Sequence, residues 1–283
     1  MVGYNAVGRP PSRVTRFLPG RCHDALNRLL RVMPFSTRRL MALLVQWVKR
    51  QPQGYLCLDD VIVEKGFAQK LLLAGWNYSL AKQHQVCGPH IVVLLWCSAD
   101  SHWRIPVAFR LSRPKRSCAK HDYRSKLQLA EGMLKELLVL GLTCQHIVFD
   151  THYSAGWFTK TLGRLGCVWQ GTLGPRTHVV WHGQRQRVCD LAASLHLKWR
   201  KQLGLRALAW RVSAPKYGVL RLVVTRNRHG NYEYIVSNAL QADLTTMVQR
   251  RRGRWEVVTI FRDTKQLVWE PANAGCTWPR SAT

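Results

Sequence analysis

Two apolar segments of this chain, residues 55–60 and 146–150, each end in aspartate. Their other side chains are mostly apolar, which predicts two short strands buried in a sheet. An aspartate at the end of a buried strand projects where the strand meets a loop, and two such ends brought together form an oxygen-rich pocket. Carboxylate oxygens are the ligands that hard divalent cations prefer. The sequence therefore predicts a metal site built from Asp59 or Asp60 together with Asp150.

Positive charge dominates the composition. The 283 residues include 43 lysines and arginines against 15 acids, a formal net charge of +28, and 47% of the residues are hydrophobic. So much apolar content can bury one large core, and the excess charge around it favours a polyanionic partner, of which nucleic acid is the obvious one. Arginines spread along the whole chain can also reflect GC-rich coding, in which case they mark no particular surface.

Several other classes of protein are not indicated. The nine cysteines are odd in number and never form a C-x-x-C spacing, which predicts neither a zinc site nor a disulfide framework. His178 and His182 flank a β-like stretch, where their spacing does not put both on one metal. The longest strongly apolar run, residues 90–96, falls far short of the ~18 residues needed to span a bilayer, and the N-terminus lacks a signal-peptide core. We expect a cytoplasmic protein that does not contact membranes.

The order of expected elements indicates the fold class. Residues 1–53 read as basic and helical, and a Gly- and Ala-containing loop is expected up to Ser79. From residue 54 we expect strand, strand, strand, helix, strand, helix, strand, at residues 55–63, 91–97, 103–109, 125–140, 146–150, 155–165 and 167–171. This order is typical of an α/β protein in which helices cover a mixed sheet.

Three local motifs carry a resemblance to a known family. Residues 58–65, 149–153 and 254–266, taken in order with their strands, resemble the bacterial insertion-sequence DDE transposases with an RNase H-like core and a Y-R-E-K helix. The resemblance implies an α/β fold, an RNase H-like mixed sheet flanked by helices. It divides the chain into a basic helical N-terminal region, the first part of the core, a mostly β insertion, the last core helix and an irregular tail, at residues 1–53, 54–170, 171–238, 239–270 and 271–283.

The resemblance also implies a chemistry. Such enzymes cleave and transfer DNA strands at the ends of their element with two metal ions, Mg²⁺ or Mn²⁺, and by resemblance Asp59 and Asp150 hold them. Consecutive strand residues point to opposite faces, so only one of Asp59 and Asp60 can face the site. We favour Asp59, which shares a face with Cys57 and Val61. The implied partner is double-stranded DNA, both element ends and target, bound by a homodimer.

The third carboxylate departs from the family pattern. Counting back from Lys265, the Y-R-E-K positions hold Arg251, Arg254, Val258 and Lys265, so that valine stands where glutamate is expected. At ~100° per residue these positions share one helix face, whereas Glu256 lies about 200° away from Val258. Three readings remain open: a decayed and inactive copy, a helix bulge that recruits Glu256, or a different register.

The chain after residue 267 reads as a truncated or frame-shifted C-terminus, which favours decay. We expect DNA contacts from the helix residues Arg251, Arg254 and Lys265. Basic and aromatic residues of the insertion should also contact DNA, namely Trp181, Arg200 and Lys201. Tryptophan in a β-rich segment is, however, more often part of a core. The alternative functions are a DNA-binding remnant without catalysis, and an RNase H-like nuclease or resolvase that uses two carboxylates.

Overall fold

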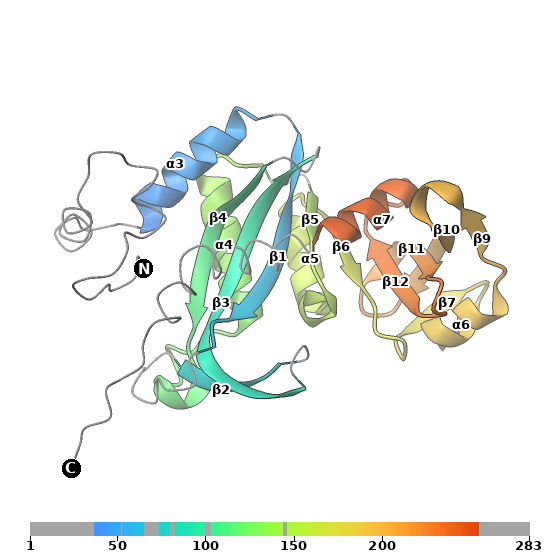
Figure 1. Ribbon diagram of the computed structural model, residues 1–283, viewed down its shortest axis with the longest axis horizontal. Helices are drawn as coiled ribbons and strands as arrows, with labels where there is room; N and C mark the ends of the chain where they lie inside the picture. Colours follow the sequence, from blue (N-terminus) through green and yellow to red (C-terminus); the bar gives the residue numbers. More distant parts are fainter. Residues whose placement is uncertain are drawn as a thin grey trace, which may run out of the picture. The chain divides into compact units, whose positions relative to one another are not determined.

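The computed structural model describes residues 37–51, 53–64, 74–79, 83–99, 103–143 and 146–254. Those that follow Leu43 belong to one compact unit (Figure 1). Glu256, Val258 and Lys265 lie outside the described residues, as do the tail and the first 36 residues. Helix α3 (Thr37–Lys49) is the first described element. Within the described residues, no helix combines the length and the apolar character needed to cross a membrane.

The central part of the sheet has the expected RNase H-like arrangement. Its strands are β1 (Gly54–Ile62), β3 (His84–Ser98), β4 (Arg104–Ser112), β5 (His146–Val148) and β6 (Val168–Thr172). They follow the order β4-β3-β1-β5-β6, with β3 antiparallel to β1 and β4, and with β5 parallel to both β1 and β6. Helix α4 (Lys126–Val139) packs on β3 and β4, and α5 (Gly156–Arg164) packs on β6. Both helices lie behind these strands in the view of Figure 1. The predicted α/β class and mixed sheet are confirmed.

Burial explains why these segments fold as they do. In β3 every residue from Val92 to Cys97 is at most 5% exposed, so the apolar run is the middle of the sheet. Helix α4 starts with a capping box between Ser125 and Gln128, and its buried residues recur at helical spacing towards the sheet. The helix is followed by Gly141 at a φ of +77°, the left-handed conformation that glycine adopts most readily.

One strand occurs where a loop was expected. Strand β2 (Ala74–Ser79) pairs antiparallel with the first half of β3, from Pro89 to His84. Glycine at position 75 lowers the intrinsic strand propensity of this segment, which is why its sequence reads as a loop. Pairing with β3 overrides this preference.

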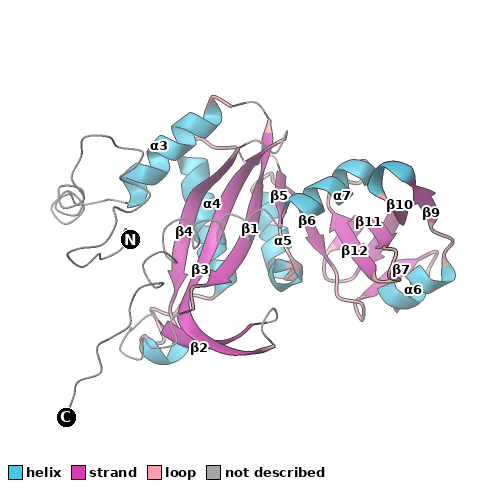
Figure 2. Ribbon diagram, in the orientation of Figure 1, coloured by secondary structure: helices cyan, strands magenta, loops and turns pink. Residues whose placement is uncertain are grey.

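The remaining strands continue the same sheet (Figure 2). They are β7 (His178–Trp181), β8 (Gln184–Arg187), β9 (Lys198–Arg200), β10 (Leu205–Ala214), β11 (Gly218–Arg226) and β12 (Tyr232–Ser237). Strand β12 pairs antiparallel with β6, and the order then runs β12-β11-β10-β7-β8. Helices α6 (Val188–Ser194) and α7 (Leu244–Gly253) complete the described part, α7 packing on both β6 and β12. The strand β6 is thus shared between the two halves of the sheet.

Candidate catalytic site

The parallel pairing of β1 with β5 brings the two aspartates together, Asp59 from within β1 and Asp150 from just after the end of β5. The expectation that Asp59 ends its strand is wrong, because β1 continues to Ile62 in its pairing with β3. Leu56 lies opposite Ile147 and Cys57 opposite Val148, so the same register places Asp59 beside Asp150. Neighbouring strands are ~4.8 Å apart, within reach for two carboxylates to share a ligand. The Asp150 carboxylate also caps the short 3-10 turn η2 (Thr151–Tyr153), where its Oδ1 accepts a 2.9 Å hydrogen bond from the backbone N–H of His152.

Asp59 is a buried carboxylate paired with an arginine. Its residue is 7% exposed, and its Oδ2 accepts a hydrogen bond from Nη1 of Arg254, which follows α7 directly. Its Oδ1 accepts a 2.9 Å bond from the backbone N–H of Asp60. Burial raises the pKa of Asp59 to about 6 despite Arg254, and the nearby charges of Asp150 and Asp60 push it in the same direction. Burial therefore makes Asp59 easier to protonate than an exposed aspartate, even with Arg254 beside it.

Asp60 points to the other face of β1 and is saturated by donors. Its Oδ2 interacts with His90 and, at 3.1 Å, with Nζ of Lys126, while its Oδ1 accepts a 2.9 Å bond from the Tyr153 hydroxyl. Burial opposes ionisation, but His90 and Lys126 outweigh it and hold the pKa of Asp60 well below its usual range. Burial and the Asp60 charge raise the pKa of Tyr153. This geometry favours Asp59 over Asp60 as a metal ligand.

The network around Asp60 was not foreseen from the sequence. His90 comes from β3, Lys126 from the first turn of α4, and Tyr153 from the turn that Asp150 caps. His90 pairs with Ile62, two residues beyond Asp60 on the same face. Of these three residues, only Tyr153 lies close in the sequence to a predicted site residue, three positions after Asp150.

Two of the three arginines expected to contact DNA, Arg251 and Arg254, face carboxylates. The Arg254 side chain is 6% exposed and bonded to Asp59. Arg251 lies one helical turn earlier, where its Nη2 is 2.7 Å from Oε1 of Glu233 and burial lowers its pKa. Its Nε and Nη1 are buried without a hydrogen-bond partner among the described residues. Both guanidinium groups thus belong to the neighbourhood of Asp59 and Asp150.

The insertion residues lie farther along the sheet. Trp181 ends β7, is partly exposed, and has its ring centroid 6.4 Å from that of Trp210. Arg200 ends β9 and Lys201 begins the 3-10 turn η3 (Lys201–Leu203), and both are exposed. In the strand order, four strands separate β7 from β5. These residues are not brought next to the paired aspartates by the pairing of the strands.

No group of three His, Cys, Asp or Glu side chains in the described part of the chain is arranged to hold a metal ion. What the described residues supply is a pair of carboxylates on adjacent parallel strands with a buried guanidinium beside them.

Comparison with known proteins agrees with this geometry. A family model described as DDE superfamily endonuclease matches residues 12–196, roughly two thirds of the chain, a range that includes Asp59 and Asp150. No curated protein matches the chain. The match agrees with the strand order of the core and with the pairing of the two aspartates. The chain belongs to the DDE superfamily endonucleases.

Proposed function

We propose that this protein is a transposase, which cleaves DNA strands at the ends of a mobile element and joins them to a target with the help of divalent metal ions. The observation that carries the proposal is the register of the parallel strands β1 and β5, which sets Asp59 beside Asp150. Membership of the endonuclease family supports cleavage of DNA. Transposition itself rests on the resemblance of the three sequence motifs.

The residues present fit a magnesium ion. Mg²⁺ keeps several of its waters and needs only one or two carboxylates in addition to substrate phosphates. Asp59 and Asp150 supply that number from adjacent positions of two parallel strands. When bound, the metal would polarise the phosphate and lower the pKa of a bound water.

The protein's own side chains have separable roles in this proposal. Asp150 accepts a hydrogen bond from the His152 N–H through Oδ1, which would leave Oδ2 to hold a metal ion. Arg254 donates a hydrogen bond to Asp59 in this structure, and its guanidinium would be available to a phosphate oxygen if a metal ion bound that carboxylate. Tyr153, Lys126 and Asp60 hold the strand and the turn that carry the two aspartates.

A second candidate, DNA binding without cleavage, is favoured by one specific observation. Valine occupies the glutamate position of the Y-R-E-K pattern at residue 258, and valine cannot bind a metal ion. With two carboxylates alone the site could bind a metal too weakly for turnover. A nuclease or resolvase that cuts without strand transfer would share the same paired aspartates.

A nicking assay separates these candidates. Supercoiled plasmid is incubated with the protein in Mg²⁺, in Mn²⁺ and in EDTA, and the transposase and nuclease readings predict nicking with either metal and none in EDTA. Asp150→Ala should abolish nicking. Asp190→Ala is the matched control, because Asp190 is a half-exposed aspartate paired with Arg187 at 2.7 Å on α6. Nicking that survives Asp150→Ala would overturn the assignment of the site.

The remaining outcomes distinguish the readings. Tight, salt-sensitive DNA binding with no nicking in either metal supports the binding protein. If nicking then appears in Val258→Glu, the missing carboxylate explains the loss. Nicking without joined products supports the nuclease.

A further inference from the structure

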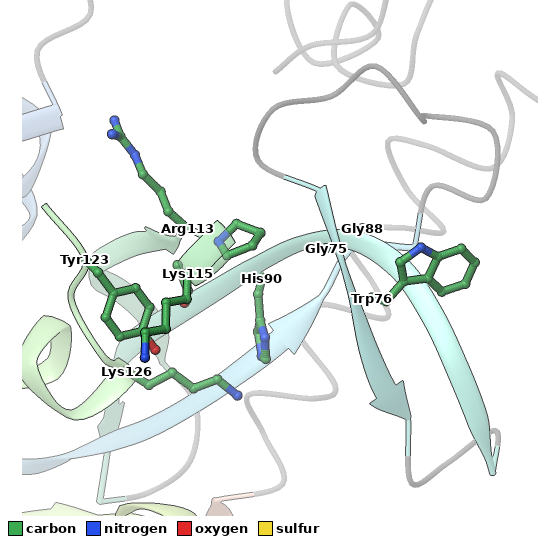
Figure 3. A pocket seen from close by; sticks show the side chains of 10 residues that line it. Gly75, Trp76, Gly88, His90, Arg113, Lys115, Tyr123 and Lys126 are labelled. Atoms are coloured by element: carbon green, nitrogen blue, oxygen red, sulfur yellow. The ribbon is translucent and has the colours of Figure 1, made fainter. Parts of the chain in front are cut away.

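A basic pocket of about 460 Å³ lies beside the Asp60 network, between strands β2 and β3 and the segment that leads into α4. We call it the β2–β3 pocket. Its charged and aromatic lining consists of Trp76, His90, Arg113, Lys115, Tyr123 and Lys126. Figure 3 shows Lys115, Tyr123 and Lys126 gathered on one side of His90, with the Trp76 ring on the other.

The charge of the pocket is fixed and of one sign. Among the described residues that line it, none is acidic. Lys126 and His90 are held on its inner side by Asp60, while Arg113 and Lys115 are exposed at its edge. A lysine ammonium and an arginine guanidinium select an anion, and a phosphate group is an anion that several nitrogen donors bind well.

The lining residue Trp76 is exposed, and so is Tyr78 two positions further along β2. Trp76 is 61% exposed and Tyr78 is 55% exposed, although both are large hydrophobic residues. They lie two positions apart on the same face of β2, which spaces them ~6.7 Å along the strand. Open aromatic faces next to phosphate-binding cations are the two components with which proteins hold unpaired nucleotides.

Duplex DNA cannot use these rings, because its bases are stacked on each other and only their edges face the grooves. An unpaired base presents its whole face. The volume of the pocket lies in the usual range for a small-molecule site and leaves room for a nucleotide.

We propose that the β2–β3 pocket binds single-stranded DNA, with a phosphate held by Arg113, Lys115 and Lys126 and a base stacked on Trp76. The proposal rests on the proposed function only in taking DNA as the ligand, and it does not require that the paired aspartates cleave. An unpaired strand bound here would be held on the Asp60 side of β1, apart from the Asp59 side that faces Arg254.

The test measures binding of the full chain to a fluorescein-labelled oligothymidylate and to a duplex of equal length, by anisotropy in EDTA so that cleavage plays no part. Trp76→Leu should weaken single-strand binding about tenfold, the loss of one stacked base, with less than a twofold change for the duplex. Trp157→Leu is the control, because Trp157 is 45% exposed on α5, away from the pocket lining, and should leave both affinities unchanged.

The cationic side is tested by salt dependence. Lys115→Gln should reduce the slope of log K against log salt for the single strand by about 0.7, the contribution of one phosphate contact. Lys160→Gln on α5 removes an exposed lysine outside the pocket and should leave the slope unchanged. Thermal unfolding verifies that each variant is folded, and since Trp76 and Lys115 are exposed, their midpoints should match the wild type.

Two outcomes would overturn the proposal. Equal losses for single strand and duplex would show that Trp76 and Lys115 serve general attraction to DNA, and unchanged affinities in both variants would show that the pocket is not a binding site. Failure of the nicking assay with single-strand binding intact would count against the proposed function alone, because the binding measurement contains no metal.

Discussion

Replacing Arg254 with methionine removes the guanidinium that donates to Asp59 and leaves a buried carboxylate without its cation. The two side chains are 6% and 10% exposed. Breaking one partner of such a buried pair costs about 3–5 kcal/mol, because the remaining charge stays out of water. For a unit of this size, ~1 kcal/mol corresponds to about 2–4 °C, so in EDTA the unfolding midpoint of Arg254→Met should fall by roughly 10 °C.

Metal should then stabilise the variant more than the wild type. In Arg254→Met no guanidinium competes for Asp59, and a divalent cation that binds Asp59 and Asp150 replaces the missing positive charge. Ligand binding to the folded state raises its stability in proportion to the logarithm of ligand concentration over Kd. Scanning calorimetry in EDTA and in a Mg²⁺ series therefore should show a larger rise of the midpoint for Arg254→Met.

A control variant and a double variant test whether the buried charge of Asp59 causes the loss of stability. Arg187→Met breaks a half-exposed ion pair with Asp190 and should cost no more than ~1 kcal/mol. Asp59→Asn/Arg254→Met carries neither charge and should recover part of the loss without responding to Mg²⁺. Two results would contradict a role for the buried charge: a double variant as unstable as Arg254→Met, or an equal rise of the unfolding midpoint with Mg²⁺ in wild type and Arg254→Met.

Two further predictions concern the same region. Because the pKa of Asp59 is raised to about 6, protons compete with metal for this carboxylate below that pH. The apparent affinity for Mn²⁺, measured calorimetrically, should therefore be constant above about pH 6 and fall up to tenfold per pH unit below it. An affinity unchanged down to about pH 5 would exclude Asp59 as a ligand. Gly253→Ala places a Cβ 2.0 Å from the Tyr55 hydroxyl and should lower the free energy of unfolding in urea by about 1–3 kcal/mol. Gly163→Ala adds a Cβ with nothing within 4 Å and should raise the free energy of unfolding by ~0.5–1 kcal/mol. Equal effects of the two substitutions would contradict the close contact at Gly253.

The sequence predicted the middle of the fold because local signals are strong there. Apolar runs such as Val92 to Cys97 can only be buried strands or helices, and Ser125 with Gln128 and Gly141 marks both ends of α4. Asp59 and Asp150 could be expected to lie close together because the two apolar runs that carry them were predicted to be strands of one α/β sheet. These inferences needed only short windows of sequence and one rule of sheet topology.

The pairs that define the electrostatics could not be predicted. Asp59 and Arg254 are 195 residues apart, and their contact depends on where α7 lies against β1. His90 reaches Asp60 only because the register of β1 with β3 puts both on one face. Strand β2 is stabilised by pairing with β3, a tertiary effect that no local propensity reports.

The pairing of β12 with β6 makes the inserted segment part of one continuous hydrogen-bonded sheet. Ile235 lies opposite Thr172, and the Gln170 side chain donates a 2.7 Å bond to the backbone oxygen of Met247 in α7. Excising the segment would expose the outer edge of β6, and expressing the segment alone would expose the edge of β12. Unpaired edges of this kind invite association with other chains. The segment from β7 to β12 is thus poorly suited to exchange as a separate module, because the pairing of β12 with β6 would have to be retained.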